Sequence, residues 1–396
     1  MSKRILVCSI ILFSFLLGNF NIELGFALKP FMITSFFLII SLSLSNIRSI
    51  QLSNFDYMFF TLSIYGGITA MFSPDIIAGL RLFILSQLCM VCYLSTTLYF
   101  TQLKYSVQEI NHSILITGFL FNIFSFIFYF IGLYTVLNDG DFGNFSGQDI
   151  FGLTIDRGLP RMIGLTFDPN FFVMFNIIFF YFLAFKKRNK FESFTFILVA
   201  LAIIFSLSRG GILAIALPIF YNFFQSFIRL KISKRAIRIS IFVIILILAI
   251  ALYMGDFLYI ILEKRFGNLG SGSGRTSLIN TMFELIASNP LFGVGWHNFR
   301  YYNNEITGNY HYGHNTFLEL LTELGLVGFF LYTFFLIFVF HRAYKISSIE
   351  PTLSYLKYSF WAFMISMFFL SSIVNEVFFL YMILIKTYYN ALTHKI

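Results

Sequence analysis

The chain has 396 residues, of which 58% are hydrophobic and 11% are charged, against roughly 25% charged residues in a typical soluble domain. So much apolar side chain would leave almost no polar surface, which excludes an ordinary soluble domain and indicates lipid as the solvent. The formal net charge of +9 comes from short basic clusters between apolar runs, a pattern of membrane topology that excludes a nucleic-acid groove.

Apolar runs follow one another along the chain, and a helix needs about 20 apolar residues to cross a bilayer. The sequence therefore predicts an all-α protein, a single membrane domain over residues 1–396 with about twelve transmembrane helices. The first run follows Lys3 and Arg4 as in a signal peptide, but without a small-x-small cleavage site, so we predict a membrane helix. The expected spans are residues 5–21, 24–45, 55–73, 77–100, 112–136, 163–185, 191–208, 210–228, 239–260, 325–341, 355–374 and 376–393.

Basic clusters predict the orientation, because they stay on the cytoplasmic side of a membrane. The strongest clusters are residues 186–190 and 229–238, and placing both inside puts both termini in the cytoplasm. We therefore expect a multi-pass protein of the inner membrane. The other basic residues that then fall inside without adjustment are Lys3, Arg4, Arg48, Lys104, Arg342, Lys345 and Lys395.

Two polar segments, residues 137–162 and 255–324, are too long to be turns, and both come out on the extracytoplasmic side. Loops of this length are usually functional. Within the second, an amphipathic helix is predicted over residues 276–288, and we expect it to lie along the membrane surface. Its apolar side carries Leu278, Met282, Leu285 and Ile286.

The expected outer face is rich in arginine, whereas lysine outnumbers arginine inside. Membrane topology does not distinguish the two, but the forked guanidinium binds phosphate or carboxylate through two hydrogen bonds. We interpret the surplus as anion recognition; the alternative is pairing with outer acids such as Asp156, Asp168 and Glu263. The outer arginines are Arg81, Arg157, Arg161, Arg209, Arg265, Arg275 and Arg300.

Two of these arginines have informative surroundings. Arg209 stands between two apolar runs in residues 206–211 (SLSRGG), and a charge at the end of a membrane hairpin is usually functional, snorkelling to the interface being the alternative. Arg275 lies near the start of the amphipathic helix, where helix amides and a guanidinium make an anion site. For Arg275 the alternative is a salt bridge with Glu284.

Four pieces of sequence occur in order on the expected outer side. They are residues 161–170 (RMIGLTFDPN), residues 206–211, Gly274-Arg275 followed by residues 289–296 (NPLFGVGW), and His314-Asn315 followed after nine residues by Gly325-Leu-Val-Gly328. The last piece resembles the His-Asn-x9-Gly-x-x-Gly signature of the O-antigen ligase and O-antigen polymerase superfamily. The other pieces, the number of helices and the large outer loop also resemble this superfamily.

The resemblance implies a membrane glycosyltransferase that uses neither a metal nor another cofactor. Its implied donor is a glycan on undecaprenyl diphosphate, held in the membrane lipid. A ligase passes the finished polymer to the lipid A core, whereas a polymerase passes a growing chain to the next lipid-linked repeat unit. We favour the polymerase, with the ligase as the close alternative because the motifs are shared. For a polymerase the resemblance also implies a chain-length regulator protein as a partner.

The residue types suit this chemistry. Arg209 and Arg275 are expected to neutralise the departing diphosphate, as a metal ion does elsewhere. His314 is expected to take the proton from the acceptor hydroxyl, and Arg161 to be a third contact to phosphate or sugar. The expected substrate-binding residues are Arg161, Asn170, Asn315 and Trp296.

Other interpretations were weighed against this one. Asp139-Gly-Asp141 has the spacing of a metal-binding motif, but we interpret both as loop acids, and the three cysteines lie inside apolar runs as packing residues. A transporter of lipid-linked glycans would place charges along a path through the mid-membrane, which is here nearly free of charge. A non-catalytic partner in an assembly complex would explain the topology but not the arginine and histidine pattern.

Overall fold

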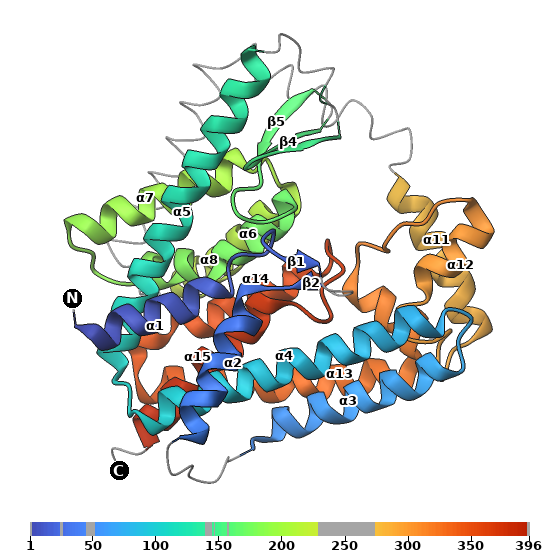
Figure 1. Cartoon of the computed structure of the whole chain (residues 1–396), viewed down its shortest axis with the longest axis horizontal. Coiled ribbons are helices and arrows are strands. Elements are labelled where there is room, and N and C mark those ends of the chain that lie inside the picture. The colour runs from blue at the N-terminus through green and yellow to red at the C-terminus, as the bar shows by residue number, and fades with distance from the viewer. Residues whose placement is uncertain are drawn as a thin grey trace.

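The computed structural model describes residues 2–23, 27–44, 52–138, 145, 147–156, 158–228 and 274–393, without the side chains of residues 225–228 and 274–275 (Figure 1). The expected span 239–260, the basic cluster 229–238, Arg157, Arg265 and the Asp139-Gly-Asp141 motif lie outside the described residues. The helices are α1 (Lys3–Ser14), α2 (Pro30–Ser43), α3 (Asn54–Met71), α4 (Ile76–Gln102), α5 (Val107–Asn138), α6 (Pro169–Ala184), α7 (Lys190–Phe205), α8 (Arg209–Ile228), α11 (Gly274–Ser288), α12 (Phe299–Thr307), α13 (Thr316–Ile349), α14 (Tyr355–Met367) and α15 (Glu376–Thr393).

These helices confirm the all-α expectation. By length and composition, three of the described helices could cross a membrane, namely α4, α5 and α13. Shorter apolar helices cover Pro30–Ser43, Pro169–Ala184 and Arg209–Phe224. The expected number of twelve spans is therefore not confirmed by the described part of the chain.

Polar caps begin several helices close to the start of their apolar runs. Asp168 accepts hydrogen bonds from the N–H groups of Asn170 and Phe171 at 2.7 and 3.1 Å, and Pro169 takes the first position of α6. α6 therefore begins six residues after the start of the expected span 163–185 (169 − 163 = 6), because Asp168 supplies a cap that hydropathy alone does not reveal.

Small and polar residues join neighbouring helices, as is common in membrane bundles. α3 and α4 are linked by a 2.9 Å hydrogen bond between Ser63 and Ser86, and α5 and α6 by one of 2.9 Å between Asn122 and Asn176. In Figure 1, α3 lies along the lower part of the molecule, where it packs against both α13 and α4.

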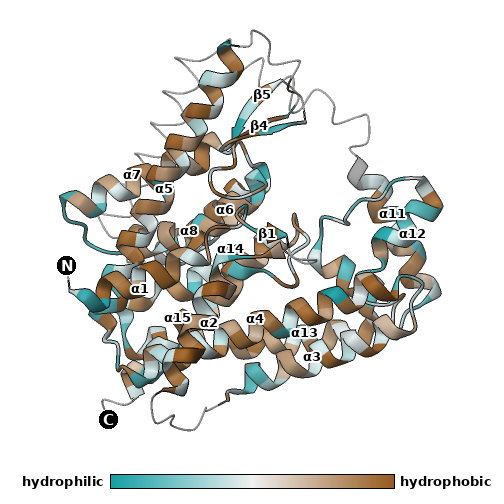
Figure 2. Cartoon of the chain, in the orientation of Figure 1, coloured by the Kyte–Doolittle hydropathy of each residue, from teal (hydrophilic) through white to brown (hydrophobic). Residues whose placement is uncertain are grey.

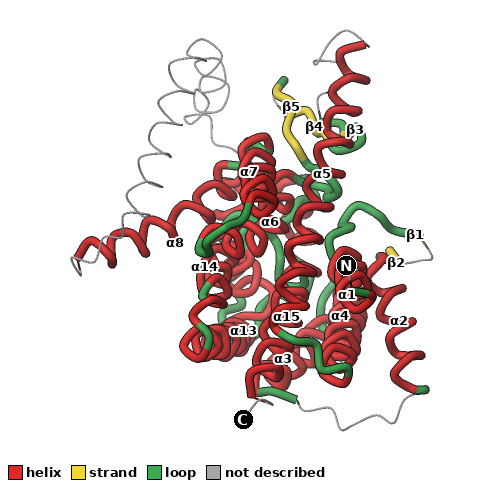
Figure 3. The backbone as a smooth tube through the Cα atoms, turned by 90° about the vertical axis from the view of Figure 1, so that its left-hand side faces the viewer, coloured by secondary structure: helices red, strands yellow, loops and turns green. Residues whose placement is uncertain are grey.

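The expected outer loop 137–162 forms a small antiparallel sheet of β3 (Asp149–Ile150), β4 (Leu153–Asp156) and β5 (Leu159–Met162). It lies against α5 (Figure 3), where the N–H of Gly152 donates a 3.4 Å hydrogen bond to the carbonyl of Phe128. A second hairpin pairs β1 (Ile22–Glu23) with β2 (Ala27–Leu28). Polar residues gather on β4 and β5 and around α11 and α12, away from the marked chain ends (Figure 2).

The predicted amphipathic helix exists as α11, but its surroundings differ from the expectation. Leu278, Met282 and Leu285 are buried and pack with Val294 and Phe299 inside the protein. The expectation that this face lies along the membrane surface is therefore wrong. The reason is that α12 and the start of α13 supply an apolar partner surface that helical periodicity does not reveal.

A buried ion pair joins α3 to α15 inside two expected membrane spans. Lys386 Nζ lies 2.5 Å from Asp56 Oδ2, with side chains 10% and 0% exposed, and Tyr93 donates a 2.6 Å hydrogen bond to Asp56 Oδ1. The expectation of a nearly charge-free interior therefore has an exception. Here each charge is matched by the other, which is how ionisable groups persist in apolar surroundings.

We expect Lys386→Met to lower the free energy of unfolding by about 3–5 kcal/mol, because it leaves the buried Asp56 carboxyl group without its cationic partner. Thermal unfolding of the detergent-solubilised protein measures this as a lower melting temperature. The matched control is the double variant Asp56→Asn/Lys386→Met, which removes both charges and should recover most of the loss. A single variant as stable as the wild type would show that the pair contributes little.

Candidate functional site

The first two sequence pieces, residues 161–170 and 206–211, meet in the structure. Arg161 on β5 places Nη1 2.9 Å from Asp156 Oδ2 on β4, and its Nε donates a 3.1 Å hydrogen bond to the carbonyl of Ser206. Burial lowers the pKa of the Arg161 guanidinium, and the charge of Asp156 opposes that shift. With 8% of its surface exposed, Arg161 ties the sheet to the α7–α8 turn.

Side-chain contacts then join this turn to the start of α6. Ser208 Oγ donates a 2.5 Å hydrogen bond to Asn170 Oδ1. The next turn of backbone packs closely, since a Cβ on Gly210 would lie 2.7 Å from the ring of Phe369. Arg209 therefore begins α8 directly after a residue that contacts Asn170, and its own residue surface is exposed.

The glycine of the fourth piece interrupts α13. Gly325 has φ 63° and ψ −166°, a backbone conformation open essentially to glycine alone. A Cβ on Gly325 would lie 2.3 Å from the carbonyl oxygen of Leu291, and the N–H of Leu326 donates a 2.9 Å hydrogen bond to the carbonyl of Pro290. The loop with residues 289–296, from the third piece, therefore packs against the break in α13. The third and fourth pieces thus form one structural unit.

The end of that loop is anchored on α3 and α13. Trp296 is 1% exposed, and a Cβ on Gly66 would lie 2.2 Å from its ring. Glu323 on α13 accepts hydrogen bonds from the N–H groups of His297 at 2.8 Å and Phe299 at 3.2 Å. Trp296 thus fixes the loop against α3, and the buried carboxylate of Glu323 fixes the start of α12.

His314 is held at the start of α13 by polar contacts around it. Asn315 Oδ1 caps this helix, accepting from the N–H groups of the second and third residues after it at 3.1 Å each. His314 has φ 51°, and its N–H donates a 3.1 Å hydrogen bond to Ser371 Oγ. Ser371 in turn donates a 2.5 Å hydrogen bond to Glu319 Oε1. The exposed His314 side chain therefore starts from a backbone fixed by α13 and by the loop before α15.

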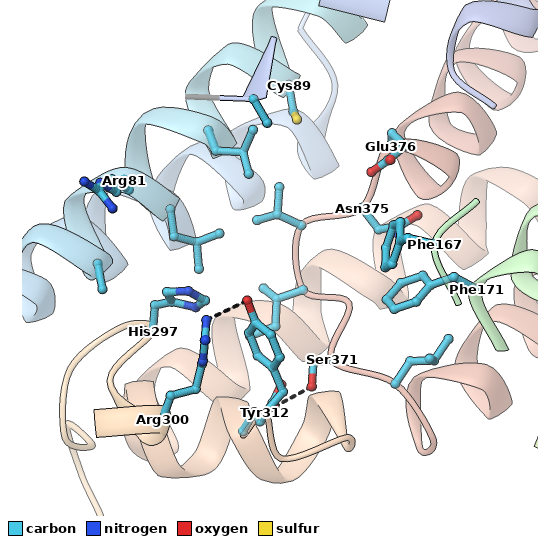
Figure 4. Close-up of a pocket in the computed structure, with 18 of the residues that line it drawn as sticks. Arg81, Cys89, Phe167, Phe171, His297, Arg300, Tyr312, Ser371, Asn375 and Glu376 are labelled. Atoms are coloured by element: carbon cyan, nitrogen blue, oxygen red, sulfur yellow. Dashed lines mark hydrogen bonds between the residues drawn. The ribbon is translucent and has the colours of Figure 1, made fainter. Parts of the chain in front are cut away.

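A cavity of about 1070 Å³ lies between these segments. Its walls come from the β1–β2 hairpin, α4, the turn before α6, α12 with the segment that follows it, and the loop before α15 (Figure 4). Many small-molecule sites are of this size or smaller. Its polar lining includes Lys29, Asp75, Arg81, Asn170, His297, Arg300, Tyr310, Tyr312, His314, Glu319, Ser371 and Glu376.

The cavity has two chemically different regions (Figure 4). One carries the rings of Phe167, from the turn before α6, and Phe171, from the first turn of α6, with Asn375 and Glu376 nearby. The other, around α12, carries Arg300 and His297 beside aromatic side chains. An amphiphilic molecule with an apolar tail and a polar head fits this division.

Charges in the cavity are partly matched within the protein. Lys29 Nζ lies 2.5 Å from Glu376 Oε1, so the hairpin cation is paired. Within the described part of the chain, no carboxylate forms an ion pair with Arg81 or Arg300. Burial, and then the charge of Arg300, lowers the pKa of His297 to about 4, so His297 is neutral near pH 7. The cavity therefore offers arginine charge to an anionic ligand.

The sequence-predicted residues fall into distinct places. His314 and Asn170 line the cavity, whereas Arg209 does not belong to its lining and begins α8 directly after a residue that contacts Asn170. Arg161 and Trp296 are buried in supporting contacts, and Asn315 caps α13. The side chain of Arg275, at the start of α11, lies outside the described residues.

Residues 194–333 match the family model described as O-antigen ligase. Over these residues the chain is similar to that family. Among curated proteins, none shows significant similarity to the chain. The match supports the superfamily that the sequence pieces indicated, and with it a membrane enzyme of the O-antigen ligase or polymerase type. It covers the turn before α8, the helix break at Gly325 and the His314 segment.

Several residues that line the cavity were not singled out from the sequence. Arg81 and Arg300 were among the outer arginines but had no motif around them, and His297 stands alone in its loop. Glu319 and Glu323 lie four residues apart (323 − 319 = 4) on one face of α13, which gives a detectable signal of paired carboxylates. Their roles depend on backbone N–H groups from other segments, which no spacing reveals.

We expect Gly325→Ala to destabilise the protein by more than about 1–3 kcal/mol, because its backbone conformation and the close carbonyl of Leu291 both oppose a Cβ. The control is Gly308→Ala, where φ is 73° but nothing lies within 4 Å of the added Cβ. Melting temperatures in detergent compare the two variants. Equal losses would show that Leu291 does not pack against Gly325 as described.

Protonation of His297 should weaken the fold in acid. Its folded-state pKa of about 4 lies below the usual value near 6.5, so the folded state binds fewer protons than the unfolded state. Stability is therefore complete above about pH 6.5 and is lost as the pH falls toward 4, by at most about 3 kcal/mol. We expect His297→Gln to lose less melting temperature between pH 7 and pH 4.5 than wild type, and the exposed-loop control His311→Gln to behave as wild type.

Proposed function

We propose that the protein is a polysaccharide polymerase that joins undecaprenyl-diphosphate-linked oligosaccharide repeat units on the outer face of the inner membrane. The observation that carries this proposal is the cavity itself, which combines an apolar wall, arginine charge and His314. A polyprenyl tail suits the rings of Phe167 and Phe171, and the diphosphate and sugars suit the polar lining. The family match supports a reaction of this general type.

In the proposed reaction, the acceptor hydroxyl oxygen attacks the anomeric carbon of the donor sugar. The new carbon–oxygen bond forms as the bond from that carbon to the diphosphate oxygen breaks, and the diphosphate leaves with the electron pair. The acceptor proton passes to His314, because histidine is the side chain that most often serves as a general base. The fixed backbone at His314, held through Ser371 and Glu319, supports this role because a base must meet the hydroxyl at hydrogen-bond distance.

The departing diphosphate gains negative charge, and guanidinium groups placed near it would stabilise the transition state. Arg209 and Arg275 remain our proposed contacts, each at the start of a helix, where backbone N–H groups also favour anions. In this proposal Arg161 acts indirectly, by holding the α7–α8 turn from which Arg209 extends.

The ligase is the second candidate, because the matched family model carries the ligase description. Both reactions use the same donor and the same departure of diphosphate, so the cavity described here serves either. They differ in the acceptor, which is another lipid-linked repeat unit for the polymerase and the lipid A core for the ligase. The acceptor is therefore the variable that an experiment must change.

Purified protein given only the host's undecaprenyl-diphosphate-linked repeat unit should produce a ladder of glycan lengths on a gel. We expect His314→Ala to lower the rate by about 10²- to 10⁴-fold, the usual contribution of a general base. The matched control is His311→Ala, an exposed histidine of the same segment, which should keep the wild-type ladder.

Transfer only after a lipid A core acceptor is added would make the protein a ligase. If His314→Ala produced the ladder at the wild-type rate, His314 would not be the general base and the proposed site would be wrong. Inertness with both acceptors would contradict the proposed enzyme and favour a transporter or a non-catalytic assembly partner.

A further inference from the structure

We propose that Arg300, Tyr310 and Tyr312 form a subsite of the cavity that binds a sugar residue carrying an acidic group. The inference rests on the proposed function in one respect, that the cavity receives a glycan. It adds a class of sugar and a set of residues that the reaction chemistry does not require.

The guanidinium of Arg300 is held between aromatic and hydroxyl groups. Its Cζ lies 4.1 Å from the ring centre of Tyr310 and 4.2 Å from that of Tyr312. Nη1 also donates a 2.8 Å hydrogen bond to the Tyr312 hydroxyl. These contacts reduce the freedom of a long side chain, so little conformational entropy remains to be lost when a ligand binds.

Arg300 forms no ion pair within the described part of the protein. No carboxylate there lies within 4.0 Å of its guanidinium, and no described residue accepts a hydrogen bond from its buried Nε. The acids Glu319 and Glu323 instead accept hydrogen bonds from backbone N–H groups, including those of Gly313 and Phe299. Burial raises the pKa of both acids and the charge of Arg300 lowers it, so Arg300 acts on them electrostatically without forming an ion pair. A guanidinium in a cavity that has no carboxylate within ion-pair distance favours a ligand with a carboxylate or phosphate group.

The aromatic partners point to a sugar as the carrier of that group. Tyr310 and Tyr312 are 47% and 41% exposed, and each offers an apolar ring next to a hydroxyl. A sugar ring has the matching surfaces, because its C–H groups cover an aromatic face while its hydroxyls form hydrogen bonds. The apolar wall of the cavity has Phe167 and Phe171 instead, which suits a hydrocarbon tail.

The acidic group has two possible sources on a glycan, a uronic acid carboxylate or a phosphate attached to a sugar. Both present oxygens that a forked guanidinium binds through two hydrogen bonds. The diphosphate of the lipid-linked donor is a different ligand, because it joins sugar to lipid and would meet the arginines of the reaction itself. Separate probes can therefore distinguish the three.

The test measures glycan binding to the full-length protein in detergent, without any donor lipid. The probes are a tetrasaccharide of alternating glucuronic acid and N-acetylglucosamine, its carboxyl-reduced neutral form, and glucose 6-phosphate. We expect wild type to bind the tetrasaccharide or the sugar phosphate at least about tenfold more tightly than the neutral form, a preference worth about 1.4 kcal/mol. The acidic probe that binds identifies the source of the charge.

Variants assign the preference to the subsite. Arg300→Gln should abolish it, and Arg300→Lys, which keeps the charge but not the fork, should retain only part of it. Lys187→Gln makes the same change of charge at an exposed residue outside the cavity and should bind as wild type. Size-exclusion profiles and melting temperatures establish whether each variant is folded. If Arg300→Gln does not fold, Arg300→Lys serves as the test.

Three results would overturn the subsite. They are equal binding of acidic and neutral probes by wild type, an undiminished preference in the folded Arg300 variants, and displacement of the acidic glycan by inorganic diphosphate at equal concentration. The ladder assay distinguishes failure of the subsite from failure of the proposed polymerase function. A ladder without acidic preference contradicts the subsite alone, whereas Arg300-dependent glycan binding without any transfer contradicts the polymerase alone.

Discussion

The close approach of the Leu291 carbonyl to Gly325 organises the loop before α12 and the start of α13. A continuous α13 would fill the space that the loop before α12 occupies, and a side chain at Gly325 would meet the carbonyl directly. Because the helix breaks there, the turn of α13 that precedes the break can pair its carbonyls with the loop.

Two buried acids on α13, Glu319 and Glu323, hold the neighbouring segments in place through hydrogen bonds. Glu323 receives the N–H groups at the start of α12, and Glu319 receives those of Gly313 and the hydroxyl of Ser371. A buried polar group is costly unless hydrogen bonds satisfy it, so these acids bring separate segments to fixed positions. Glu319 also holds the loop before α15, because it accepts the hydrogen bond from Ser371. Ser371 in turn accepts from the N–H of His314 and so connects His314 to the helical bundle.

Arginine serves two purposes in this architecture. Arg161 meets Asp156 and a carbonyl, and thereby joins the sheet to the α7–α8 turn. Arg300 meets aromatic rings and a hydroxyl, which leave its charge for a ligand. The sequence alone does not distinguish the roles of Arg161 and Arg300. Their roles differ because the fold places different groups around each guanidinium.

Much of the fold and part of the site were predictable from the sequence. Apolar runs and helical periodicity are local properties, so they determined the all-α class, the positions of most described helices and the existence of α11. The motif pieces likewise determined the superfamily and pointed to His314 and Asn170. Only the tertiary structure decided that α11 faces protein, that Asn315 is a cap and Trp296 an anchor, and that Arg300 lies in the cavity. Those outcomes depend on contacts between residues far apart in the chain, and the partners in such contacts leave no periodic signal in the sequence.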